Sequence, residues 1–102
     1  MKILILGAGQ VGSTLAKYLC SDNDNDITIV DQKEEMLTPL QRHLDIKTVI
    51  GYGAYPSVLE KAGIKSMDVV IAVMRSDERN MVACRMAHTL YNVKKKIARI
   101  RT

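Results

Sequence analysis

The first 31 residues combine, in order, a short apolar run, a glycine-rich turn, a helical stretch, a second apolar run and an acid. Residues 2–6 predict a strand, and Gly7-Ala8-Gly9-Gln10-Val11-Gly12 follow it as the turn. The largely apolar run of residues 27–30 predicts a second strand, which Asp31 follows directly. The chain is therefore expected to open as a strand–helix–strand unit with a tight, glycine-lined first connection.

Each glycine of this turn has a role in approaching a pyrophosphate. Gly7 allows the tight turn off the strand, Gly9 lets the backbone come close to the phosphates, and Gly12 lets the helix pack onto the sheet. Asp31 follows Gly12 by 19 residues, close to the roughly 20 expected for an acid that hydrogen-bonds ribose. The segment predicts a dinucleotide or related nucleotide site. The alternative is a turn of the same shape in an α/β fold that has lost its ligand.

Asp31 also bears on the choice of nucleotide. A carboxylate accepts hydrogen bonds from both ribose hydroxyls, each worth about 1.5–3 kcal/mol as a bond to a charged group. A 2′-phosphate would meet that negative charge at close range, so NAD(H) is favoured over NADP(H). ATP, ADP and AMP stay open as ligands because they present the same ribose. Lys33 lies close enough along the chain to weaken this preference, although a solvated lysine at a helix start is the simpler interpretation.

The rest of the chain alternates continuous apolar runs with helical patterns, as expected for a parallel sheet covered on both faces. We expect a Rossmann-like, doubly wound α/β fold of five strands in the order 3-2-1-4-5. The expected strands are 2–6, 27–31, 47–50, 68–74 and 97–101, and the expected helices are 10–20, 33–44, 56–62 and 77–92. Residues 1–102 form one domain, which stops before the sixth strand usual in such folds and so resembles a fragment of a longer chain.

Several local signals refine the helices. Pro56 suits a first helical position, Gly63 a helix stop and Ser76 an N-cap. Pro39 falls inside the expected 33–44 helix, where we expect a kink or a restart with Thr38 as N-cap. One apolar stripe at helical spacing in the last helix is expected to be core; it comprises Val82, Ala83, Met86, Ala87 and Leu90.

Further candidates for ligand contact follow the other strands. Met74 and Arg75 come after the fourth strand, on the side opposite Asp31, and Arg75 is either a phosphate or ribose contact or an exposed loop cation. Gly51-Tyr52-Gly53 would lie near the adenine, although these glycines more simply serve the strand-to-helix turn. Arg99 and Arg101 share one face of the expected last strand. Either that strand is an open edge or these arginines meet an anion, and Arg99 is the preferred contact.

The sequence also excludes several classes of function. We find no HExxH, GxSxG, Walker A or paired-carboxylate arrangement, and Cys20 and Cys84 lack the spacing of a metal knuckle or redox pair. No catalytic residue and no metal ligand is therefore assigned. The net charge is +4 and the only aromatic residues are four tyrosines, so no stacking platform for nucleic acid is visible. No run approaches the roughly 18 apolar residues of a membrane span, and no cleavable leader precedes the first strand, so a cytosolic protein is expected.

Five motifs in this order resemble the N-terminal nucleotide-binding domains of the RCK/KTN family, the class that includes the cytosolic regulatory subunit of bacterial Trk potassium uptake. They are Gly7 to Gly12, Asp31, Val49 to Leu59, Ser76 to Cys84 and Ile97 to Arg101. The resemblance covers essentially the whole chain. It implies that Gly7 to Val11 cradle the phosphates, that Asp31 holds the ribose, and that Met74, Arg75 and Arg99 complete the contacts.

The same resemblance implies a non-catalytic sensor of NAD(H), with ATP or ADP as further ligands. Paired domains would act on a membrane potassium transporter from the cytosolic face of the inner membrane, without inserting into it. The family often has small or polar residues where Met74 and Arg75 stand, and some relatives have arginine in place of Gln10, which weakens the case for ATP. The rival interpretation is the cofactor-binding half of an NAD-dependent dehydrogenase.

Overall fold

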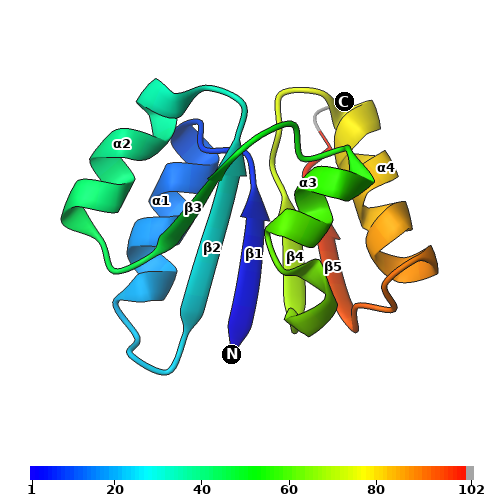
Figure 1. Ribbon diagram of the computed structural model, residues 1–102, viewed down its shortest axis with the longest axis horizontal. Helices are drawn as coiled ribbons and strands as arrows, with labels where there is room; N and C mark the ends of the chain where they lie inside the picture. The colour runs from blue at the N-terminus through cyan, green and yellow to red at the C-terminus, as the bar shows by residue number, and fades with distance from the viewer. Residues whose placement is uncertain (101–102) are drawn as a thin grey trace.

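The protein folds as one parallel sheet with helices on both faces (Figure 1). The computed structural model describes residues 1–100. The strands are β1 (Lys2–Leu6), β2 (Asp26–Asp31), β3 (Lys47–Ile50), β4 (Val69–Ala72) and β5 (Lys95–Ala98). The helices are α1 (Gln10–Cys20), α2 (Glu34–His43), α3 (Pro56–Lys61), the short 3-10 helix η1 (Ile64–Ser66) and α4 (Asp77–Thr89).

The strand order β3-β2-β1-β4-β5 confirms the predicted doubly wound topology. β1 lies at the centre, with Leu6 in register with Val30 of β2 and with Ala72 of β4. Because all pairs are parallel, the strands end at one edge of the sheet (Figure 1). The loops that follow β1, β2 and β4 therefore meet at this edge.

Alternate residues of β1 enter two separate cores. Ile3 and Ile5 face α1 and α2, where they join a cluster with Ala16, Leu37 and Leu40. Leu4 and Leu6 face α3 and α4 and join a cluster with Leu59, Ala83 and Ala87. Successive side chains of a strand point to opposite faces, so a strand covered on both sides needs a continuous apolar run. Burial of each Ile or Leu side chain of β1 stabilises the fold by about 1.5–3 kcal/mol.

The predicted helix signals are confirmed at three positions. Pro56 is the first residue of α3, and Gly63 follows that helix with a φ of +84°. At the start of α4, the Ser76 hydroxyl oxygen accepts a hydrogen bond from the Arg79 backbone N–H at 3.3 Å. These residues set where the helices on this face of the sheet begin and end.

The predicted restart at Thr38 is wrong, because α2 continues through Pro39 from Glu34 to His43. Thr38 does not cap a new helix; its hydroxyl donates to the Glu34 carbonyl at 3.1 Å. Pro39 cannot donate to the carbonyl of Glu35, but both residues are exposed, so water can solvate that carbonyl. Burial of the neighbouring Leu37 and Leu40 stabilises the helix on its inner side.

The predicted core stripe of α4 is only partly correct. Ala83 and Ala87 are buried and Met86 packs against the same core, whereas Val82 and Leu90 are 46% and 58% exposed. α4 lies over the edge of the sheet near β5 (Figure 1). Part of its apolar surface therefore extends past the strands, and no element among residues 1–100 covers it.

The last strand is also shifted from its predicted position. β5 runs from Lys95 to Ala98 rather than over 97–101, with Lys95 in register with Val69. It is an edge strand, where exposed lysines are common because they discourage pairing with another chain. Arg99 thus lies just beyond the strand, and the predicted face shared with Arg101 falls outside the described residues.

Candidate functional site

A cavity of about 340 Å³ lies at the carboxyl ends of the strands, where the strand order reverses. This is where open α/β sheets bind ligands, and the volume falls in the range of roughly 300–1,000 Å³ found for small-molecule sites. The loops after β1, β2, β3 and β4 and the first turn of α4 line it. The lining residues are Gly7, Gly9, Val30, Asp31, Gln32, Lys33, Met36, Gly51, Tyr52, Gly53, Val73, Met74, Arg75, Ser76 and Arg79.

Two glycines of the turn are required by the packing of the chain on itself. Gly7 has a φ of +112°, and a Cβ there would lie 2.9 Å from the Val73 carbonyl oxygen. A Cβ at Gly12 would lie 1.8 Å from the Gly7 carbonyl oxygen. These contacts confirm the predicted tight turn at Gly7 and the predicted close approach of the helix at Gly12.

Gly9 differs from these two glycines because its free side faces open space. A Cβ at Gly9 would meet no atom within 4 Å, although the residue lines the cavity. Gly9 is also the N-cap of α1 and makes no side-chain capping bond, so the first-turn N–H groups are available to an anion. Packing of the chain on itself requires glycine at positions 7 and 12, whereas no contact within the described residues requires it at position 9.

Asp31 connects the end of β2 to the glycine turn. One carboxylate oxygen accepts a hydrogen bond from the Ala8 backbone N–H at 2.8 Å, and the other accepts one from the Lys33 backbone N–H at 2.8 Å. The carboxylate is thereby fixed at the cavity wall. Each carboxylate oxygen has two acceptor positions, so the orientation set by the backbone leaves capacity for ligand hydroxyls.

The opposite wall consists of the loop after β4 and a cluster from α4 and the loop between β3 and α3. The Arg79 guanidinium lies 4.6 Å from the ring centroid of Tyr52, a cation–π distance, and the rings of Tyr52 and Tyr55 meet edge to face at 5.1 Å. The Tyr52 hydroxyl is buried and makes no hydrogen bond among residues 1–100. Sequence reasoning missed Arg79; its position in the first turn of α4, directly after the loop that holds Arg75, was the available signal.

The structure brings together only some of the residues predicted from sequence. Gly7, Gly9, Asp31, Met74 and Arg75 line the cavity. Ala8 and Gln10 instead line a second groove of about 380 Å³ between α1 and α2. Val11, Gly12 and Arg99 line neither space, and their contact with a ligand stays a prediction.

Gly51 and Gly53 line the cavity but also pack closely. A Cβ at Gly51 would lie 2.8 Å from the Val58 side chain, and one at Gly53 would lie 3.2 Å from Leu6 Cβ. Both distances support the interpretation that these glycines serve the strand-to-helix turn.

The charge of the lining residues favours an anionic ligand. Lys33, Arg75 and Arg79 contribute three cations, against the one carboxylate of Asp31. Within residues 1–100, no group of three or more His, Cys, Asp or Glu side chains could hold a metal ion. In the same part of the chain, no helix has both the length and the apolar character needed to cross a membrane.

Both known sequences and solved structures resemble this chain. The Trk system potassium uptake protein TrkA of Halomonas elongata is 54% identical over 101 residues, which cover 99% of this chain but 22% of that protein. The TrkA-N domain of the inner membrane protein ybaL from Escherichia coli superimposes with a TM-score of 0.89 at 19% identity, covering 99% of this chain and 73% of that one. The Shewanella denitrificans Kef C-terminal domain in its AMP-bound form gives a TM-score of 0.78 at 23% identity, over 95% and 57% of the two chains.

The chain spans about a fifth of the length of the TrkA proteins of Halomonas elongata, Vibrio alginolyticus and Haemophilus influenzae. Residues 3–102, almost the whole chain, match the TrkA-N domain family. With its sheet order, its glycine turn and its relatives in agreement, the chain belongs to the TrkA-N family.

Proposed function

We propose that this domain is a non-catalytic nucleotide sensor that binds NAD(H) in the cavity at the ends of the strands. The single observation that carries the proposal is that Asp31 and Gly9, where a Cβ would meet no atom within 4 Å, line the same cavity beside the N-terminus of α1. The turn and the helix end would hold the pyrophosphate, and Asp31 the adenosine ribose. ATP and ADP are alternative ligands, since they present the same ribose.

The discrimination against NADP(H) rests on the fixed position of Asp31. Its two bonds to backbone N–H groups keep the carboxylate in place, so it cannot swing away from a 2′-phosphate without losing both. The surrounding cations Lys33, Arg75 and Arg79 attract phosphate in general. The cations therefore attract nucleotides in general, and Asp31 discriminates among them at the ribose.

We further propose that the full protein uses this domain to control a membrane potassium transporter from the cytosolic face of the inner membrane. The support is the 54% identity to a Trk system potassium uptake protein. Paired copies of the domain would change their arrangement on binding. Such control requires that the two arrangements bind the nucleotide with different affinities.

Calorimetric titration of the 102-residue chain with NADH, NAD⁺, NADPH, ATP and ADP tests the binding site. Asp31→Ala should weaken binding of every ligand that carries free ribose hydroxyls by at least roughly 10- to 150-fold, the value of one of the two charged hydrogen bonds. Asp31→Asn removes the charge but keeps one acceptor, so it should reduce the difference in affinity between NADH and NADPH. Asp26→Ala, at the opposite end of the same strand, is the matched control and should bind like the original chain. Equal affinities in all four proteins would refute the ribose assignment.

The dehydrogenase alternative is tested on the full-length protein. A sensor should bind NADH without consuming it, whereas a dehydrogenase should oxidise NADH when a suitable carbonyl substrate is present. In cells, Asp31→Ala in the full-length protein should alter potassium uptake while the protein remains at normal abundance. Unaltered uptake would contradict the sensor role, even if the domain binds nucleotide.

A further inference from the structure

Asn80 is a fully buried polar residue on α4, with 0% of its surface exposed. Its Oδ1 accepts a hydrogen bond from the Met74 backbone N–H at 2.7 Å, and its Nδ2 donates to the carbonyl oxygens of Met74 and Arg99 at 3.0 Å each. A buried amide is tolerated only when such bonds satisfy it. One side chain thus connects two loops that lie 25 residues apart in the sequence.

These two loops have different relations to the cavity. Met74 lines it, whereas Arg99 does not. Arg99 follows the edge strand β5, and its own backbone N–H donates to the Ala72 carbonyl at 2.9 Å. The cavity wall and the chain beyond β5 are therefore linked by backbone pairing on one side and by Asn80 on the other.

The first turn of α4 joins the same unit. Arg79 precedes Asn80 and reaches into the cavity, while Asn80 points into the core. The Ser76 hydroxyl fixes the start of this turn through the Arg79 N–H. A ligand that displaces Met74 or Arg79 would consequently move the group that holds Arg99.

We propose that Asn80 is a positioning residue that couples the nucleotide cavity to the backbone at Arg99, beyond β5. The proposal rests on the proposed function for its ligand, but the coupling itself is a property of the ligand-free chain. An amide is suited to this position because it offers an acceptor to one N–H and donors to two carbonyls. Neither aspartate nor serine can satisfy all three partners.

The first test needs no ligand and uses amide hydrogen exchange by NMR on the 102-residue chain. Asn80→Asp keeps the shape of the side chain but cannot donate to both carbonyls. Asn80→Ser shortens the side chain so that it cannot contact all three partners. In both variants, exchange should accelerate about tenfold or more, the value of a lost buried hydrogen bond. In Asn80→Ser the acceleration should occur at Met74 and also at Arg99, although the Arg99 N–H bonds to Ala72 and not to Asn80. In Asn80→Asp the carboxylate still accepts from the Met74 N–H, so the acceleration should occur at Arg99.

Cys84→Ala is the matched control, since Cys84 is half-buried one turn further along α4 and packs against the same core. It should leave exchange at Arg99 within about threefold of the original chain. If Asn80→Ser accelerates exchange at Met74 but not at Arg99, the coupling is refuted. Acceleration of equal size in Cys84→Ala would show a general loosening of the helix and would also refute it.

The second test adds NADH as the probe and follows the backbone amide signals. In the original chain, NADH should shift Gly7 and Gly9 directly and shift Arg99 and the Asn80 side-chain amide through the proposed link. In Asn80→Ser, the shifts at Gly7 and Gly9 should persist and the shift at Arg99 should fall by at least half. Shifts at the glycines with none at Arg99 in the original chain would overturn the coupling even if neither variant folds. Absence of any shift at the glycines would instead count against the proposed function, and the exchange test would still decide the coupling.

Discussion

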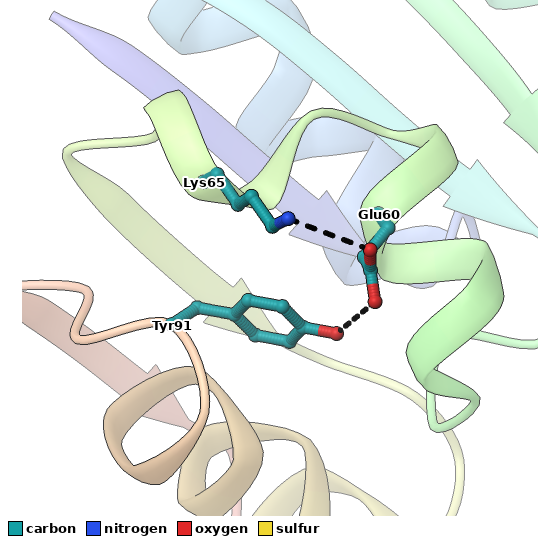
Figure 2. A network of polar contacts seen from close by, with 3 residues as sticks. All are labelled: Glu60, Lys65 and Tyr91. Carbon is teal, nitrogen blue, oxygen red and sulfur yellow. Dashed lines mark hydrogen bonds and ion pairs between the residues drawn. The ribbon is translucent and has the colours of Figure 1, made fainter.

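Two carboxylates in this domain, Asp31 and Glu60, each interact with two partners. The partners of Asp31 are backbone groups, and those of Glu60 are side chains. Asp31 accepts from the backbone N–H groups of Ala8 and Lys33, both at 2.8 Å. Glu60 of α3 accepts from the Tyr91 hydroxyl at 2.9 Å and pairs with the Lys65 ammonium at 3.6 Å (Figure 2). The Lys65 and Glu60 side chains are 73% and 50% exposed.

The difference shows why one carboxylate suits recognition and the other does not. Backbone donors are already ordered by the fold, so Asp31 is held without further loss of side-chain freedom. The Glu60 contacts must order long, solvated side chains, which offsets most of the attraction. Recognition requires groups that keep their geometry before the ligand arrives, and the glycine turn gives Asp31 that property.

The largest effect is expected from Gly12→Ala, which tests whether packing of the turn fixes the Asp31 region. The added Cβ would lie 1.8 Å from the Gly7 carbonyl oxygen, so helix α1 must move away from the turn. We expect a loss of about 3 kcal/mol in the free energy of unfolding, the upper part of the usual range for overpacking. Urea denaturation measures this.

Ser13→Ala is its control, since it changes the next residue and removes only a 3.2 Å bond to the Gln10 carbonyl. It should stay within about 1 kcal/mol of the original chain. Similar losses in the two variants would mean that the turn is not the tightly packed element described above.

A smaller effect is expected from Asp31→Ala, compared directly with Glu60→Ala. The first change leaves the part-buried Ala8 N–H without its acceptor and should lower the free energy of unfolding by about 1–3 kcal/mol. The second removes an exposed ion pair and a surface hydrogen bond and should cost no more than about 1 kcal/mol. Thermal and urea unfolding of both variants without nucleotide measure the difference. A larger loss in Glu60→Ala than in Asp31→Ala would reverse the comparison.

The sequence predicted the Asp31 region well because its determinants are local. The strand, the three glycines, the helix and the acid lie within 31 residues, and each residue type has a backbone or hydrogen-bonding reason to be there. β1 and α1 accordingly match their expected bounds, and β2 begins one residue earlier than expected. The cavity itself followed from the topology, which places Met74 opposite Asp31.

The region around β5 was predicted less well because long-range contacts decide it. Lys95 and Lys96 precede the expected strand 97–101, but pairing with Val69 and Val70 makes them part of the edge strand. Asn80 was missed for the same reason, since its partners Met74 and Arg99 lie in different loops. A signal was nevertheless present: Asn80 shares helical spacing with the buried Ala83 and Ala87, which places a polar residue on the inner face.

The smallest expected effect concerns Tyr91, whose half-buried ring points its hydroxyl toward Glu60 in Figure 2. Burial raises the pKa of Tyr91, and the hydrogen bond to Glu60 and the charge of that carboxylate raise it further. The unfolded chain therefore loses this proton first as the pH rises. The stability linked to Tyr91 is present below the unfolded pKa of about 10 and is lost as the pH rises through the folded pKa.

Near-ultraviolet titration of the tyrosines, with Tyr91→Phe to identify the signal, measures that pKa. Glu60→Gln removes the charge but not the burial, so it should lower the midpoint of Tyr91 without returning it fully to the usual value. Lys65→Ala, which removes the cation from the other side of Glu60, should raise the midpoint slightly. If neither Glu60→Gln nor Lys65→Ala changes the titration midpoint of Tyr91, the Glu60 contacts are not populated in solution. The contrast with Asp31 would then be stronger than the distances suggest, because only contacts made by the backbone would persist.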